Sequence, residues 1–506
     1  MHDIITMRPL DIVVLTSYLA GIAGLGIYFL KKNKTTEDYF LGGRSFPGWA
    51  VGLSMMGTSI SAVTFLAYPA AAFKLDWRQL FSNLPVPFVA LFAIFILIPI
   101  FRGKNRTTAF EYLEERFGPL IRLYGAVSYI VLQLMRLGSI LYLVAIPIHF
   151  LTGVNILFII VAGGIFIAIY TVAGGIEAVI WTDVIQSVVL VLGGITCLIV
   201  IVIKLPGGIS EILSVGMEAQ KFSPGPMEFN FSERTFWTVV FLGIFSWIGD
   251  YSANQSMIQR YFAASSTHEA KKATAIYMAV GIPTWVFYFF LGTSLFVFYK
   301  AIPDSNAWAK EPDQVLPYFI LTSVPAGISG IILAGVISAA MSSLDSSINA
   351  VATVSVVDIF KRFSTKDHND GYYLRLARWL SIITAVFMIG GAIIFYLLPK
   401  ETMFDLLLTI VSIFAGCVTG MFLIGFFTTR VNYKSALIAM IISISLNVYL
   451  LFNAIDLLPE LISINIHSYW ANLIVNVTFM FVAYVLSLIF RTRPQKLNRL
   501  TIWTMK

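Results

Sequence analysis

The sequence contains little charge, little cysteine and little histidine. Asp, Glu, Lys and Arg together make up 12% of its 506 residues, against about 25% in a typical soluble protein. Its two cysteines, Cys197 and Cys417, both lie inside apolar stretches, so neither a disulfide framework nor a cysteine-ligated metal site is expected. The five histidines are scattered, and no HExxH or G-x-S-x-G motif is present. These absences disfavour an enzyme, a nucleic-acid-binding protein and a disulfide-stabilised secreted domain.

Long apolar segments dominate instead, since 58% of the residues are apolar and the mean hydropathy is +0.83. A helix needs about 20 apolar residues to cross a bilayer. The sequence therefore predicts an all-α integral membrane protein with about thirteen spans. We place them at residues 9–30, 48–74, 79–101, 120–150, 154–173, 179–204, 234–262, 272–300, 325–358, 374–398, 402–428, 431–453 and 467–490.

The positions of Lys and Arg predict the orientation. Most of the 34 basic residues, Arg260 among them, fall in alternate connecting segments on one side of the predicted bilayer. Because Lys and Arg concentrate on the cytoplasmic side of membrane proteins, the amino terminus is expected outside and the carboxyl terminus inside the cell. The net charge of +7 is then mainly a topology signal. It does not indicate a nucleic-acid partner.

The second predicted span, 48–74, is unusually polar. Within eleven positions it carries a glycine and five hydroxyl residues, namely Ser54, Gly57, Thr58, Ser59, Ser61 and Thr64. Non-helical backbone at membrane depth is tolerated where it lines a cavity, and its freed carbonyls can coordinate sodium. The alternative is that small residues allow a close helix–helix contact. The density of hydroxyls favours a broken helix with a cation site.

The ninth predicted span, 325–358, carries oxygen-bearing side chains on one helical face. These residues recur at helical spacing, and they are Ser338, Ser342, Asp345, Ser346 and Asn349. Serines in an apolar helix often just hydrogen-bond their own preceding turn. That alternative leaves Asp345 unexplained, because an acidic residue in the membrane is costly and is generally functional. The pattern favours a cation site.

Arg136 lies near the centre of the span 120–150. An arginine there is expected to face a cavity and to have a partner. Its planar guanidinium suits a substrate carboxylate. The alternative is a structural ion pair with Asp250 or Asp345.

Two further acidic residues lie inside predicted spans. Asp183 either caps the amino end of the span 179–204 or offers a carboxylate to a cation, and the sequence leaves both open. Asp250 marks a glycine-containing interruption in the span 234–262, comparable to the one in 48–74. Two interrupted helices in corresponding positions of two halves indicate an inverted repeat with a binding site at its interface.

Three segments, 170–186, 254–260 and 339–349, resemble signatures of the sodium/solute symporter family. The resemblance covers almost the whole chain. It implies a leucine-transporter-type fold of five plus five inverted helices, alternating access and sodium-driven uptake. The expected divisions are a peripheral first helix and loop (1–45), a first repeat (46–204), an extracellular loop (205–233), a second repeat (234–428) and two extra helices with a basic tail (429–506).

Within that family the chain is most similar to the bacterial sodium-coupled sialic acid symporters, through residues 58–64 and 133–136. This similarity implies symport of N-acetylneuraminate with Na⁺ across a bacterial plasma membrane, by a transporter expected to act as a monomer. Another small organic acid, a sugar or an amino acid such as proline is the alternative substrate. A passive channel or a membrane sensor is the alternative class, but neither accumulates a solute.

The same similarity implies the site residues. The first sodium would contact Gly57, Ile60, Ala339, Ser342 and Ser343. A possible second sodium would contact Asp183, Ser342, Asp345 and Ser346, although the sialic acid branch has serine where this chain has Asp345. The substrate would contact Ser59, Ser61, Thr64, Gln79, Asn83 and Arg136, although Gln79 and Asn83 differ from the expected residue types. Two sodium ions with one monoanionic sialate would make transport electrogenic.

Overall fold

Helices are the regular secondary structure of the part of the chain that the computed structural model describes. That part comprises residues 8–30, 33–60, 62–233, 235–308, 311–366, 368–398, 416–454, 457–459, 461–490 and 497–505. Nine of its helices are long and apolar enough to cross a membrane, and two bent helix pairs raise the number of spans to as many as eleven. The prediction of an all-α membrane protein is confirmed.

The first half of the chain runs from a long outer helix to a short helix beyond α9. Its elements are α1 (Pro9–Leu30), α2 (Thr36–Leu41), η1 (Gly42–Arg44), α3 (Gly48–Ser59), α4 (Ala62–Lys74), η2 (Arg78–Asn83), α5 (Val86–Phe92), η3 (Ala93–Leu97), α6 (Ile98–Arg102), α7 (Ala109–Phe117), α8 (Pro119–Thr152), α9 (Ile156–Lys204) and α10 (Gly208–Glu218).

The second half begins with another broken span. Its elements are α11 (Phe236–Ser252), α12 (Gln255–Ala263), α13 (Thr267–Ala301), α14 (Ser305–Trp308), α15 (Pro312–Ser323), α16 (Ile328–Val354), η4 (Ser355–Phe360), α17 (Lys361–Phe363), α18 (Asp370–Leu397), α20 (Val418–Phe427), α21 (Tyr433–Ala454), α22 (Trp470–Ile489) and η5 (Ile502–Thr504). Most of the predicted span 402–428 lies outside the described residues.

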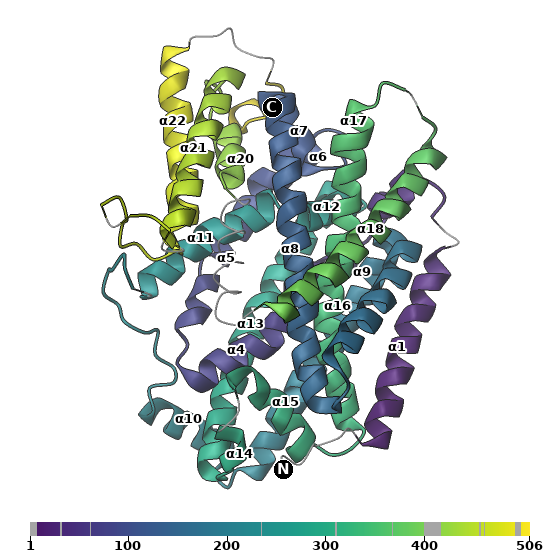
Figure 1. Cartoon of the computed structure of the whole chain (residues 1–506), viewed down its shortest axis with the longest axis vertical. Coiled ribbons are helices and arrows are strands. Elements are labelled where there is room, and N and C mark those ends of the chain that lie inside the picture. The colour runs from purple at the N-terminus through teal and green to yellow at the C-terminus, as the bar shows by residue number, and fades with distance from the viewer. Residues whose placement is uncertain are drawn as a thin grey trace.

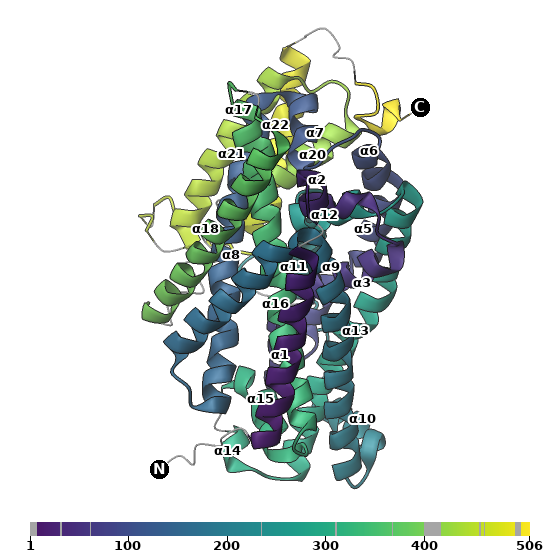
Figure 2. The same ribbon diagram turned by 90° about the vertical axis from the view of Figure 1, so that its right-hand side faces the viewer.

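The molecule has two ends, between which the long helices run. One end carries α7 and α17 and is called the α7 end below; the opposite end carries α10, α14 and α15 and is called the α10 end (Figures 1 and 2). Helix α16 runs through the interior, α1 lies on the outside beside α9, and α21 packs against α22.

The predicted spans 154–173 and 179–204 are joined without a loop. They form the two halves of α9, which meet at Gly175. Gly175 has φ 56° and ψ −158°, a conformation that side chains disfavour. A Cβ atom there would also lie 2.8 Å from the carbonyl oxygen of Tyr39. The two predicted spans are therefore joined at a single glycine, where the sequence predicts a loop.

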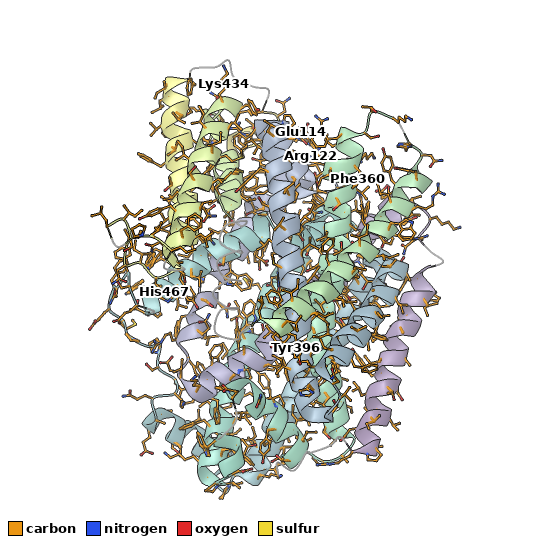
Figure 3. The ribbon with its side chains drawn as sticks, in the orientation of Figure 1. Glu114, Arg122, Phe360, Tyr396, Lys434 and His467 are labelled. Carbon is orange, nitrogen blue, oxygen red and sulfur yellow. The ribbon has the colours of Figure 1, made fainter. Side chains whose placement is uncertain are left out.

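Ion pairs join four elements at the α7 end. Arg122 at the start of α8 bonds Glu114 of α7 at 2.6 Å and Asp358 of η4 at 2.7 Å, and Arg362 also pairs with Glu114. Figure 3 shows Glu114 and Arg122 close together at this end. Arg122 is 8% exposed. Arg122, one of the basic residues whose distribution predicts the orientation, therefore also holds α7 to α8 and η4.

Candidate cation and substrate site

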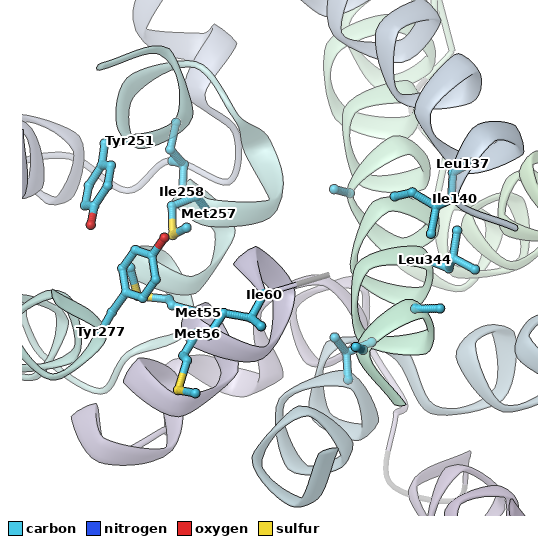
Figure 4. Packing of buried hydrophobic residues seen from close by; sticks show 14 of the residues in the cluster. Met55, Met56, Ile60, Leu137, Ile140, Tyr251, Met257, Ile258, Tyr277 and Leu344 are labelled. Carbon is cyan, nitrogen blue, oxygen red and sulfur yellow. The ribbon is translucent and has the colours of Figure 1, made fainter. Parts of the chain in front are cut away.

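The second span is broken at the position that its polar sequence predicts. Helix α3 ends at Ser59, α4 begins at Ala62, and the two parts are bent by 53°. Ile60 has the non-helical angles φ −87° and ψ 81°, and Figure 4 shows it on the side of α3 that faces α16. Because the helix stops here, carbonyl oxygens of its last turn have no following turn to bond.

Hydroxyls of α16 meet these carbonyls. Ser342 Oγ donates to the carbonyl oxygen of Gly57 at 2.6 Å, and Ser343 Oγ donates to that of Thr58 at 3.0 Å. Ser342 Oγ also lies 3.4 Å from the carbonyl oxygen of Ala339. Three of the five predicted first-site residues are thus joined directly. Of the other two, Ser343 bonds the neighbouring carbonyl, and Ile60 is fully buried at the break beside them.

Gly57 brings α3 close to α9 as well. A Cβ atom at this position would lie 2.6 Å from Ser187 Oγ and 3.2 Å from the carbonyl oxygen of Asp183. Any side chain would therefore push the broken end of α3 away from α9. The glycine allows the close approach that places Asp183 against the same turn of α3.

Asp183 contacts the cation-site helices and does not cap a helix. It lies eight residues beyond Gly175, inside the second half of α9, and is fully buried. Its Oδ2 accepts from Ser54 Oγ at 2.5 Å and lies 3.4 Å from Thr58 Oγ1. Its Oδ1 is buried without a hydrogen-bond partner among the described residues. Of the two roles that the sequence left open, helix capping does not fit, because Asp183 lies inside α9 and its carboxylate faces α3.

Arg260 is a component of this cluster that sequence reasoning missed. Its guanidinium is 1% exposed. Nη2 donates to Asp183 Oδ2, to Ser346 Oγ and to Thr58 Oγ1, at 2.7, 2.7 and 2.6 Å. The expectation that Arg260 is a loop charge was therefore wrong. Arg260 lies on α12, which continues the broken span beyond α11.

Asp345 belongs to the same cluster. Its Oδ1 accepts from the backbone N–H of Ser346 at 2.6 Å, and its Oδ2 accepts from the hydroxyl of Tyr170 at 2.9 Å. The carboxylate is fully buried. With both carboxylates ionised, Asp183 and Asp345 would exceed the charge of Arg260 by one negative charge.

The predicted substrate residues lie on elements that pack together. Ser59 ends α3, Thr64 is on α4, and Gln79 and Asn83 are on η2, while α4 packs against both η2 and α8. Asn83 Nδ2 donates to the Tyr68 hydroxyl at 3.4 Å. The Oε1 of Gln79 is buried without a partner in the described part of the chain. Ser61 lies outside the described residues.

Arg136 is not paired with either acidic residue considered as its partner. Asp250 accepts from Asn254 Nδ2 at 2.6 Å, in the break between α11 and α12, which are bent by 44°. Asp345 is bonded to Tyr170. Among the residues that the structure describes, no salt bridge involves Arg136, whose side chain is partly exposed. Arg136 nevertheless lies near enough to Asp250 to interact with it electrostatically.

Comparisons with known proteins identify the family of the chain. The family model described as the sodium:solute symporter family matches residues 39–443. The chain belongs to the sodium:solute symporter family. Within this family, it is 34% identical over 438 residues to the sodium/sialic acid symporter SiaT of Proteus mirabilis, covering 86% of this chain and 88% of that protein.

A solved structure of a Na⁺-coupled sialic acid symporter is similar to this chain over nearly its whole length. It shows that protein in a substrate-bound, outward-open state and reveals a novel Na⁺ site in it. The TM-score is 0.86 at 30% identity, over 97% of this chain and 99% of that one. The human sodium-coupled monocarboxylate transporter 1 is 29% identical over 87% of this chain and 72% of that protein. The predicted transporter fold, with its broken helices, is confirmed.

Proposed function

We propose that this chain is a secondary active transporter, and not an enzyme, that imports N-acetylneuraminate together with sodium. It acts as a monomer in a bacterial plasma membrane, with the α10 end outside and the α7 end in the cytoplasm. The observation that carries the proposal is the contact of Ser342 and Ser343 with the carbonyls of the broken α3. Hard oxygen atoms from a helix break are the groups that hold sodium in transporters of this kind.

Sodium bound at this contact would bridge α3 and α16. The proposed first repeat (46–204) contains α3, and the proposed second repeat (234–428) contains α16, so the ion joins the two. The corresponding breaks of 53° after α3 and 44° after α11 support this division. A ligand shifts a conformational equilibrium only by its different affinity for the two states. Sodium would therefore favour the state in which α3 is held against α16.

The charge of the cluster formed by Asp183, Asp345 and Arg260 supports a second sodium ion. With both carboxylates ionised, the cluster of Asp183, Asp345 and Arg260 carries one buried net negative charge, and a buried unpaired charge is costly. One sodium ion near the unpartnered Oδ1 of Asp183 would compensate it. Two sodium ions with one sialate anion would then move one net positive charge in each cycle.

The substrate carboxylate would bind Arg136. The guanidinium offers two parallel N–H donors to a carboxylate, and the structure pairs it with neither Asp250 nor Asp345. Ser59, Ser61 and Thr64 at the broken span, with Gln79 and Asn83 on η2, would hydrogen-bond the sugar hydroxyls. Because Ser59 directly follows the carbonyls of Gly57 and Thr58, sodium that orders this turn also orders the substrate contact.

The test is uptake by purified protein in liposomes. An inward sodium gradient should drive accumulation of radiolabelled N-acetylneuraminate above equilibrium, and a negative internal potential should increase the rate. Potassium or choline gradients of equal size are the controls. Unlabelled lactate, pyruvate, glucose and proline, each in excess, should not compete.

The similarity to a monocarboxylate transporter makes a short organic acid the second candidate. Sodium-driven uptake of labelled pyruvate, with no uptake of N-acetylneuraminate, would transfer the proposal to that substrate. Equilibration without accumulation would indicate a channel and would overturn the proposal.

A further inference from the structure

Helix α1 contacts the helices of the cation site through its polar and glycine residues. It lies on the outside of the molecule beside α9 and α16 (Figures 1 and 2), and only 17% of its most apolar stretch is buried. Its few inward-facing positions, however, meet specific atoms of α16 and α9, at three depths along the helix.

The first contact caps α16. Asp11, fully buried, accepts hydrogen bonds at its Oδ1 from the backbone N–H groups of Gly327 and Gly330 and from Ser329 Oγ, at 2.7, 3.0 and 2.7 Å. The N-cap residue of α16, Gly327, has no side chain with which to do this. Asp11 therefore supplies in trans the acceptor that the first turn of a helix needs, and it fixes where α16 begins.

The second contact lies one turn before the sodium-site serines. The hydroxyl of Tyr18 is 2.5 Å from Ser338 Oγ, and Ser338 Oγ donates to the carbonyl oxygen of Ala334 at 2.5 Å. Because the Ser338 hydrogen goes to that carbonyl, Tyr18 is the donor to Ser338. Ser342 follows Ser338 by four residues on the same helical face.

The third contact reaches Asp345 through α9. A Cβ atom on Gly26 would lie 2.5 Å from the Cβ and 3.0 Å from the Cα of Tyr170. Tyr170 in turn donates its hydroxyl to Asp345 Oδ2 at 2.9 Å. The absence of a side chain at Gly26 therefore sets how far Tyr170, and with it the hydrogen bond to Asp345, lies from α1.

We infer that α1 positions the second cation site, with Tyr18 and Gly26 as positioning residues that act through Ser338 and through Tyr170 and Asp345. The inference rests on the proposed sodium-coupled function. Neither residue touches the ion. A shift of Tyr170 or of the Ser338 turn moves oxygen ligands relative to Asp183, and cation affinity falls steeply when ligand geometry is lost.

The glycines of α1 provide a matched test. Gly26→Ala forces the close contact with Tyr170, whereas alanine at Gly24 or Gly21 meets nothing within 4 Å. The readout is the thermal unfolding midpoint of the purified protein titrated with NaCl at constant ionic strength with KCl. We expect Gly26→Ala to raise the half-maximal sodium concentration at least about fivefold. Gly24→Ala should leave it unchanged.

The hydroxyl of Tyr18 is tested in the same way. Tyr18→Phe removes only the hydrogen bond to Ser338 and should raise the half-maximal sodium concentration about two- to tenfold. Ser17→Ala is the control, because the exposed Ser17 hydroxyl bonds only the carbonyl of Val13 in its own helix. In a Tyr170→Phe background, Gly26→Ala should have much less effect, because the two changes act on one hydrogen bond.

These titrations separate the inference from the proposed function. If the unchanged protein shows no stabilisation by sodium over potassium, the proposed function fails. If it does respond, and Gly26→Ala and Tyr18→Phe lower the midpoint without sodium but keep the same half-maximal concentration, then α1 is only structural and the inference is wrong.

Discussion

At the residue scale, the candidate site consists of short contacts between side chains and the backbone of a broken helix. Ser342 and Gly57 could be singled out from the sequence, because hydroxyls at helical spacing and a glycine in a polar span are unusual in a lipid-facing helix, and the family resemblance added Ser343. Arg260 and Tyr170 could not. Each reaches the cluster from another helix, over 86 residues to Ser346 and 175 residues to Asp345, and periodicity carries no information about such contacts.

Ser342→Ala should weaken sodium binding without harming the fold. The substitution removes the hydroxyl that reaches the carbonyl of Gly57, so the sodium concentration for half-maximal uptake should rise about tenfold, while the rate at saturating sodium is retained. Ser294→Ala is the matched control, since the Ser294 hydroxyl bonds only the carbonyl of Phe290 in its own helix. An unchanged sodium dependence in proteoliposome uptake would remove Ser342 from the ion site.

Arg136→Lys tests the guanidinium fork apart from its charge. Lysine keeps the positive charge but cannot bond a carboxylate through two parallel donors. We expect the KM for N-acetylneuraminate to rise about tenfold or more, and Arg136→Ala to be worse because the carboxylate then has no cationic partner. The half-maximal sodium concentration at saturating substrate should stay near that of the unchanged protein. Uptake that tolerates both substitutions would assign Arg136 to structure.

At the element scale, the spans follow from hydropathy, and their breaks follow from local composition. The breaks after α3 and α11 coincide with polar, glycine-containing stretches that the sequence displays. The sequence did not predict that the two halves of α9 join without a loop, because Gly174 and Gly175 lie in an apolar run that does not signal the positive φ of Gly175. The close approach of Tyr39, which leaves no room for a Cβ atom at Gly175, is a tertiary feature that the local sequence does not display.

The connection at α7 should be sensitive to acid. Burial of Glu115 opposes its ionisation, but hydrogen bonds from Arg106 and Lys104 lower its pKa below the ordinary value of 4.5. The ion-paired carboxylate therefore stabilises the folded protein above pH 4.5, and this contribution is lost as the pH falls through the lowered pKa. The thermal unfolding temperature should therefore decrease as the pH falls below 4.5.

Glu115→Gln isolates that contribution. The variant should have a midpoint about 2–4 °C lower at pH 7, because Arg106, 1% exposed, loses its carboxylate partner. Its midpoint should also change less between pH 5 and pH 3.5 than that of the unchanged protein, in thermal scans in detergent. Parallel pH profiles for the two proteins would show that Glu115 stays ionised or contributes nothing.

At the scale of the whole molecule, the orientation in the membrane remains a prediction from the distribution of positive charge. Both native cysteines are fully buried, so single cysteines can be added without removing them. Ser210→Cys in the exposed part of α10 should react with a membrane-impermeant maleimide in intact cells. Thr365→Cys, exposed beyond α17, should react only after permeabilisation. Labelling of Thr365→Cys in intact cells, with Ser210→Cys labelled only after permeabilisation, would indicate the opposite orientation.

The central claim is that sodium held between α3 and α16 determines the affinity of the neighbouring site for an organic anion. Its most direct test is the Kd of N-acetylneuraminate for the purified protein by calorimetry, in sodium and in potassium at equal ionic strength. Because coupling between two bound ligands is reciprocal, we predict tight binding in sodium, much weaker binding in potassium, and an equal factor by which saturating sialate tightens sodium. The same Kd in both salts would contradict the account.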